Sequence, residues 1–167
     1  MDEITRRFLS EKPKTKARGI AQEEVRKYLL DFKPEIGAPG WTPALTEVAI
    51  RARLRPDDYA QEVFGYVATT ARLEIKRVQV VFRGGVRGVA VDFGTFFRDV
   101  FTCGFAVETV IPFHTHPSGN AEPSPADYTV HDTLRDICLL FGLRCEDHLI
   151  LTEAGCFSLA EGGMVPD

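Results

Sequence analysis

The stretch "FHTHPSGNAEPSPADYT", residues 113–129, contains two of the four histidines of the chain, one aspartate and three prolines. The apolar run "ETVIPF" at residues 108–113 leads into it and predicts a β-strand that ends at the histidines. Residues 125–142 then repeat apolar side chains at helical spacing, and Gly142 is a typical helix stop. The sequence therefore predicts a strand, a polar connection and a long helix.

The two histidines of this stretch are placed to act together. His114 and His116 are two residues apart, so on a strand both imidazoles point to one face and Thr115 points to the other. Asp127 falls in the first turn of the predicted helix, where it can face back toward the strand end. Two neutral imidazoles and one carboxylate, with the fourth position left to water, are the ligand set of a catalytic zinc site.

Each of these residues also has an ordinary structural interpretation. Ser124 before Pro125, with Asp127 in the first turn, is a good helix start in any protein. A lone histidine is more often a packed or surface residue than a ligand, and His131 and His148 are interpreted in that way. The spacing H-x-H, seven residues, S-x-x-D favours the metal site, because the two patterns occur together.

The rest of the chain predicts an α+β fold with a mixed central sheet flanked by helices. Residues 1–55 are interpreted as a basic tail with a small helical extension, and residues 56–167 as the main domain. Apolar spacing predicts helices over residues 22–32, 43–53, 56–70 and 95–105. In the last of these, four residues are predicted to point inward: Phe97, Val100, Phe101 and Phe105. Residues 74–82 and 86–93 predict a hairpin, and residues 147–152 and 156–160 predict two final strands.

Composition narrows the class of protein. With 167 residues, 44% of them hydrophobic, the chain is expected to form one globular domain with appendages. It has no apolar run of about 20 residues and no signal-peptide pattern, so a cytoplasmic protein with no membrane partner is expected. Four scattered cysteines without a C-x-x-C pair are interpreted as packing residues: Cys103, Cys138, Cys145 and Cys156.

Charge bears on possible partners. A net charge of -4 argues against a protein whose main task is coating nucleic acid. The first eighteen residues are locally basic, and they are interpreted either as a solvated arm or as a docking site for an acidic partner.

The histidine-rich stretch resembles the JAB/MPN-type metallopeptidases, whose signature is an upstream glutamate followed by H-[S/T]-H-x7-S-x-x-D. His114-Thr115-His116, seven residues and then Ser124 to Asp127 match it without gaps. The segments "FRDVF", "HPSG", "DHLIL" and "SLAEGG" resemble the RadC branch of bacterial JAB proteins, over about residues 57–163. The chain differs from that branch at Thr115, where RadC proteins usually have asparagine. The helix-hairpin-helix region that usually precedes the RadC domain is not recognisable in the first 55 residues.

The resemblance implies a zinc ion held by His114, His116 and Asp127, with Ser124 steadying the tetrahedral intermediate and a glutamate as general base. Three glutamates are candidates for that base. Glu108 begins the strand of the histidines, too far from its histidine end, and Glu62 falls in a predicted helix. Glu74 opens the first body strand, where the family's glutamate is expected, and is the predicted base.

The same resemblance implies hydrolysis of an amide at the C-terminal tail of a protein, such as a ubiquitin-like modifier or its conjugates. The tail is expected to bind extended, as an added strand beside the His114–His116 strand. Two other functions stay open: a RadC-like protein associated with DNA repair or mobile elements, and a non-catalytic MPN scaffold. The sequence predicts neither the particular substrate nor the oligomeric state.

Overall fold

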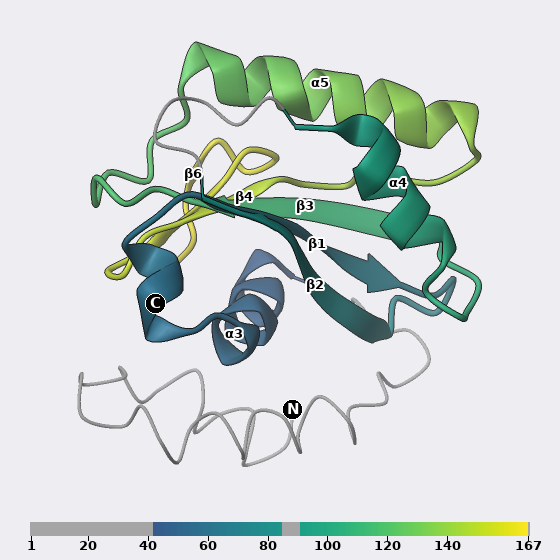
Figure 1. The fold of residues 1–167 in the computed structure, drawn as a ribbon, viewed down its shortest axis with the longest axis horizontal. Coiled ribbons are helices and arrows are strands. Elements are labelled where there is room, and N and C mark those ends of the chain that lie inside the picture. The colour runs from purple at the N-terminus through teal and green to yellow at the C-terminus, as the bar shows by residue number, and fades with distance from the viewer. Residues whose placement is uncertain (1–41, 85–90, 167) are drawn as a thin grey trace.

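A computed structural model describes residues 42–84 and 91–166, and in this part of the chain a six-stranded sheet lies between two helical layers (Figure 1). The strand order is β2-β1-β3-β4-β5-β6; β3 and β4 are parallel, and the other neighbours are antiparallel. The predicted α+β fold with a mixed sheet is therefore confirmed. The elements are α3 (Pro43–Arg53), the 3-10 helix η1 (Pro56–Tyr59), β1 (Val63–Thr69), β2 (Ile75–Arg83), α4 (Phe93–Phe101), β3 (Thr109–Thr115), α5 (Pro125–Leu140), β4 (Leu149–Leu151), β5 (Cys156–Ser158) and β6 (Gly163–Met164).

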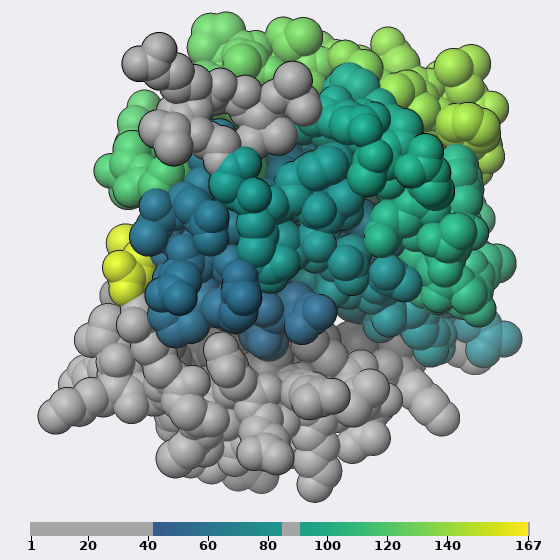
Figure 2. Space-filling view, in the orientation of Figure 1, coloured from purple at the N-terminus to yellow at the C-terminus, as the bar shows by residue number. Residues whose placement is uncertain are grey.

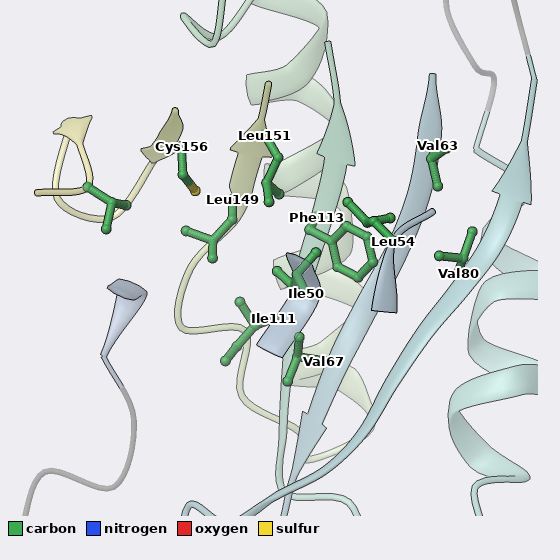
Figure 3. Close-up of a cluster of buried hydrophobic side chains, with 11 residues drawn as sticks. Ile50, Leu54, Val63, Val67, Val80, Ile111, Phe113, Leu149, Leu151 and Cys156 are labelled. Carbon is green, nitrogen blue, oxygen red and sulfur yellow. The ribbon is translucent and has the colours of Figure 1, made fainter. Parts of the chain in front are cut away.

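One face of the sheet packs against α3. Because side chains alternate along a strand, the odd-numbered residues of β1 and β3, such as Val67 and Phe113, point to this face. Ile50 and Leu54 cover them from α3 and its C-terminal cap (Figure 3). These side chains are at most 2% exposed, so this layer is a dry hydrophobic core.

The opposite face packs against α4 and α5. Even-numbered strand residues such as Phe64 and Tyr66 meet Phe96 of α4 and Leu134 of α5. α4 contacts the C-terminal cap of α5 through aromatic rings, because the ring centroids of Phe97 and Phe141 are 6.0 Å apart. The space-filling view shows the two helices in contact (Figure 2). The histidines of the opening stretch lie on this face of the sheet, because they too are even-numbered.

Helix α3 begins and ends where the sequence predicts. Thr42 caps it, accepting a hydrogen bond from the backbone N–H of Leu45 at 3.2 Å. The predicted domain boundary after residue 55 nevertheless separates this helix from the sheet whose core it completes. Arg51 joins the two further, donating to the carbonyl oxygens of Thr152 and Gly155 at 2.9 and 3.0 Å. The helix therefore belongs to the main body and not to an extension.

The predicted helix over residues 56–70 is wrong. Its first residues form η1, and β1 then begins at Val63. The apolar side chains that matched a helical stripe point instead to alternate faces of a strand that is buried throughout. Gly65 fits the strand because a Cβ there would lie 2.2 Å from the carbonyl oxygen of Gln79 and 2.6 Å from the Phe113 ring.

Of the predicted hairpin of residues 74–82 with 86–93, residues 86–90 lie outside the described residues. β2 pairs with β1, antiparallel, and Phe93 begins α4 with Asp92 as its cap. In α4, Phe97 and Val100 point inward as predicted, whereas Phe101 is 52% exposed. Phe105, the other residue predicted to point inward, is partly buried against the apolar side chains between the sheet, α4 and α5. The predicted helix of residues 22–32 and the basic tail lie outside the described residues.

The sheet order bears on how a substrate could bind. β3 lies between β1 and β4, so the expected strand addition beside the histidine strand has no free edge there, and that prediction is wrong. Among the described strands, the two at the edges of the sheet are β2 and β6. In the same part of the chain, none of the helices is both long and apolar enough to cross a bilayer.

Candidate metal centre

Three side chains converge at the C-terminal end of β3. His114 is on the strand, His116 follows it, and Asp127 comes from the first turn of α5. The two Nε2 atoms are 2.9 Å apart. Asp127 Oδ1 lies 3.1 Å from His114 Nε2, and Asp127 Oδ2 lies 3.5 Å from His116 Nε2. The structure thus brings together the three residues predicted as metal ligands.

The distances between the donor groups, measured to both oxygens of the carboxylate, are close to those that a zinc ion requires. With ligand bonds of about 2.0–2.1 Å, a tetrahedral zinc ion separates its ligand atoms by about 3.3 Å. The three separations between donor groups lie on either side of that value. Among the described residues, this is the one group of histidine, cysteine and acidic side chains compact enough to hold a metal ion.

The protonation of His116 also suits a metal. Its Nδ1 atom lies 2.8 Å from the backbone oxygen of Asn120, which can only accept a hydrogen bond, so the proton is on Nδ1. The lone pair of Nε2 therefore points at His114 Nε2 and at a carboxylate. Electron pairs at such separations repel one another unless a cation or a shared proton lies among them.

The charges of the site favour an ionised carboxylate. When a shared proton and not a cation lies among these groups, the imidazoles donate hydrogen bonds to Asp127. Burial alone would raise the pKa of Asp127, but these hydrogen bonds with His114 and His116 hold it well below its ordinary value. The hydrogen bond with Asp127 in turn raises the pKa of His116; burial opposes the rise, and the charge of Glu62 adds to it. Asp127 is therefore a carboxylate at neutral pH, the form that binds metal.

The helix cap and the metal site use the same residues. The Asp127 backbone N–H donates to Ser124 Oγ at 3.3 Å, and the Ser124 N–H donates to Asp127 Oδ2 at 2.7 Å. This is a reciprocal capping box, as the ordinary interpretation predicts. The cap holds the carboxylate against the histidines, and the Ser124 hydroxyl, while it accepts, can also donate its own hydrogen toward the site.

Glu74 lies at the wrong end of the sheet for a base. Phe64 of β1 lies opposite His114, whereas Thr69 at the other end of β1 lies opposite Ile75, next to Glu74. Five residues at about 3.3 Å each separate these positions along β1 by about 16 Å. The Glu74 carboxylate pairs there with Lys76 Nζ at 3.0 Å. The placement of Glu74 beside the histidines is therefore a wrong prediction.

Glu108 lies at that same distant end, as expected, and its backbone N–H donates to the Thr69 carbonyl oxygen. Glu62 is the candidate at the histidine end. The β1–β3 pairing ends at Phe64 and His114, and its register, continued by two residues, leads to Glu62 and His116. It is half-buried, and its charge raises the pKa of His116. The assignment of Glu62 to a helix hid this position from sequence reasoning.

Thr115 holds the backbone on both sides of Glu62. Its Oγ1 accepts from the Val63 N–H at 2.9 Å and donates to the Gln61 carbonyl oxygen at 2.8 Å. The side chain is fully buried, on the face away from the histidines. Thr115 therefore sets where the chain passes the metal ligands before it enters β1.

His148 is a further residue of the site, which the sequence analysis interpreted as ordinary packing. Its Nε2 atom lies 2.9 Å from His114 Nδ1, and its side chain is fully buried. It directly precedes β4, which runs parallel to β3 and pairs Ile150 with His114. The signal that could have found it is the position of a histidine just before an apolar strand that lies next to the ligand strand.

A two-histidine, one-aspartate triad at the end of a central strand, capped by Ser-x-x-Asp at a long helix, is the arrangement expected of a JAB/MPN-type domain. Comparison with known families agrees, because the family described as RadC-like JAB domain matches residues 44–164. The chain belongs to this family. The match begins inside α3, in agreement with the packing of that helix on the sheet.

Individual relatives are similar over most of the chain. The UPF0758 protein of Marinobacter nauticus is 32% identical over 145 residues, covering 87% of this chain and 63% of that protein. Those of Azotobacter vinelandii and Halorhodospira halophila are 33% and 34% identical over 124 residues, covering 73% and 74% of this chain and 53% and 54% of those proteins. The chain thus spans about half to three-fifths of the length of these relatives, and their names do not specify a reaction.

Proposed function

We propose that the protein is a zinc-dependent hydrolase that cleaves an amide bond at the C-terminal tail of another protein. The observation that carries the proposal is the convergence of two imidazole nitrogens and one carboxylate within 4.8 Å of one another. Membership of a JAB domain family supports a hydrolase of this kind.

The roles of the residues follow from their positions. Zinc, held by His114, His116 and Asp127, would supply Lewis acidity and make water a nucleophile near neutral pH. Glu62 takes the proton of the attacking water and passes it to the leaving amine. The Ser124 hydroxyl donates to the oxygen that becomes negative as the carbonyl is attacked.

A hollow beside the site offers a place for the tail. Its volume is about 450 Å³, and it lies between the connection of residues 119–122 and the β4–β5–β6 strands. Asn120 lines it, and the backbone oxygen of this residue holds the metal ligand His116. Gly119, Ala121 and Gly163 contribute no bulk, and β6 is an edge strand. An extended, small-residue tail could pair there with the backbone.

A ubiquitin-like modifier, or a conjugate of one, is the substrate class we propose, because such proteins present an extended C-terminal tail with small residues. The test uses zinc-loaded protein and a fusion of a ubiquitin-like protein encoded in the same genome. Cleavage at the end of the modifier, stopped by a chelator and absent with unfolded casein, is expected. No cleavage of any such fusion, or digestion of casein at many sites, would contradict the proposal.

Whether the hollow binds the tail of the substrate can be tested in the same cleavage assay. A Cβ at Gly163 would meet no atom within 4 Å, so Gly163→Leu should fill the hollow without straining the fold. The KM of the Gly163→Leu variant for the modifier fusion should rise at least several-fold, while its zinc affinity stays unchanged. Ala106→Leu, at an exposed position beyond α4, is the matched control and should behave as wild type.

The second candidate is a RadC-like protein associated with DNA repair or mobile elements, which family membership favours. The net charge of -4 weighs against a broad nucleic-acid surface. A DNA shift assay over a range of salt concentrations tests it: tight, salt-dependent binding without any tail cleavage would favour this candidate over the hydrolase.

A further inference from the structure

All four histidines of the chain form one row, although they come from three separate parts of the sequence. Ring centroids are 4.7 Å apart for His116 and His114, 4.9 Å for His114 and His148, and 5.9 Å for His148 and His131. Two of these residues are the proposed ligands, so the row extends from the metal centre into the space under α5.

The contact between His114 and His148 determines which nitrogen of His114 faces the metal. For Nε2 of His114 to bind a metal through its lone pair, the proton of the ring must lie on Nδ1. That Nδ1 lies 2.9 Å from His148 Nε2, which is then the acceptor. We propose that His148 is a positioning residue of the metal centre, which fixes the tautomer and the ring orientation of His114. The inference rests on the proposed metal site.

His148 is itself held firmly. Asp147 is fully buried, and its Oδ1 accepts from the backbone N–H of His148 at 2.6 Å and of Ala160 at 3.0 Å. Its Oδ2 accepts from Ser158 Oγ at 2.7 Å. These bonds tie the start of β4 to the turn after β5, so the backbone that carries the His148 imidazole is held in place before any metal binds.

Phe64 confines the two rings from the side of β1. Its ring stacks on His114 at 6.0 Å and 15°, and it meets His148 edge-on at 5.7 Å and 87°. The hydrogen bond between the histidines is therefore covered by an aromatic ring on the β1 side. The acceptor on His148 satisfies the buried Nδ1–H of His114, and the proton of His148 itself then lies on its own Nδ1, for which the described residues offer no hydrogen-bond partner.

An imidazole acceptor also differs in charge from the carboxylate that often supports a metal-binding histidine. A neutral ring fixes the ligand without adding a negative charge next to the metal. With Asp127 as the one anionic ligand, a divalent ion would keep a net positive charge of one. That charge is what a hydrolase uses to stabilise negative charge on its substrate.

The test compares zinc affinity in three histidine variants, measured by competition with a chromophoric chelator. His148→Leu removes the acceptor and should weaken zinc binding about 10- to 100-fold. His148→Gln keeps an acceptor oxygen near the place of Nε2 and should recover most of that affinity. His131→Leu makes the same change in the neighbouring ring, which does not touch a ligand, and should stay within about twofold of wild type.

A second measurement uses the wild-type protein. The proposed role of His148 can therefore be tested even if the His148 variants do not fold. Nitrogen-15 NMR of the zinc-loaded protein should show His114 protonated at Nδ1 and bound through Nε2. His148→Leu with wild-type affinity, equal losses in all three variants, or a proton on His114 Nε2 would overturn the inference. Tight zinc binding without hydrolysis would contradict only the proposed function, whereas no zinc in the wild type would remove the metal site itself.

Discussion

At the scale of single residues, Glu62 and Glu74 are the two candidates for the general base, and they lie at opposite ends of β1. Glu62 lies two residues before Phe64, the partner of His114, whereas Glu74 lies at the far end of β1. Glu62→Gln should keep zinc and fold but lower kcat by about 100- to 10,000-fold, because an amide cannot accept the proton of the attacking water. Zinc content and cleavage of the modifier fusion are the measurements.

Glu74→Gln is the matched control for that variant. It makes the same chemical change about 16 Å away, judged from the strand rise, and should leave both zinc and kcat as in wild type. Loss of activity in Glu74→Gln with normal activity in Glu62→Gln would reverse our assignment.

Thr115 is predicted to act on the site through the backbone. Thr115→Val keeps the shape but leaves the buried Val63 N–H without its acceptor, which should lower the free energy of unfolding by about 1–3 kcal/mol. Glu62 should then be less well placed, so kcat should fall while zinc is retained. Urea denaturation and the cleavage assay measure the two effects.

Thr115→Ser retains the hydroxyl and is the conservative comparison. It should recover most of the activity and stability that the valine variant loses. If serine and valine behaved alike, the effect would come from packing and not from the hydrogen bonds around Glu62.

At the scale of elements, the link from η1 to β1 depends on a buried carboxylate. Asp58 is fully buried and accepts from Arg55 Nη2 at 3.1 Å and Arg83 Nε at 2.9 Å. Burial acts to raise its pKa, but the hydrogen bonds from Arg83 and Arg55 lower it from 3.8 to about 2. This ion pair joins η1 to the end of β2, beside the segment that carries Glu62.

That shift predicts a pH dependence of stability. Because the pKa is lower in the folded state, ionised Asp58 stabilises the fold above about pH 4, and this stabilisation, about 2 kcal/mol, is lost as the pH falls toward 2. Asp58→Asn should lack this part of the acid destabilisation and should be less stable at neutral pH. Urea unfolding from pH 7 to pH 2 measures the difference between the two proteins.

The neighbouring Asp57 supplies the control for that measurement, since its side chain is exposed. Asp57→Asn should follow the wild type across the whole pH range. Equal pH profiles for wild type and Asp58→Asn would show that the buried pair does not stabilise the link.

The elements that the sequence predicts well are those with strong local signals. α3 and α5 begin at a hydroxyl cap followed by proline, and β3 is a short apolar run. The failure among the described residues is β1. β1 is buried on both faces, so it does not show polar alternation, and its apolar residues also fit a helix. Which strand pairs with β2 is decided by long-range packing, which local sequence does not encode.

The same difference between local signals and long-range packing explains which residues of the site could be predicted from the sequence. His114, His116, Ser124 and Asp127 lie within one continuous stretch, so their spacing predicts their convergence. Glu62 directly precedes β1 and His148 directly precedes β4, so the order of strands in the sheet brings them to the site. The sequence could not place them because that order was not predictable.

At the scale of the whole molecule, the metal centre joins two different elements of the fold, the end of β3 and the first turn of α5. His114 and His116 lie at the end of a central strand, and Asp127 lies in the helix that covers one face of the sheet. Because the unfolded chain does not hold these groups together, bound zinc should stabilise the fold.

The size of that effect can be estimated. With free zinc at 100 times Kd, the gain is about 2.7 kcal/mol, which for a chain of this length raises Tm by about 5–10 °C. Thermal unfolding of wild type and Asp127→Ala, each with and without zinc, measures it. A rise of equal size in Asp127→Ala would mean that zinc binds elsewhere.

The measurement that tests the metal centre most directly is elemental analysis of the purified protein. We expect about one zinc ion per chain in the wild type, as for a site with three protein ligands, and little in His116→Ala and Asp127→Ala. Both variants should be shown to be folded by circular dichroism. Zinc at the wild-type level in both folded variants, or no zinc in a wild type reconstituted with excess metal, would contradict the account.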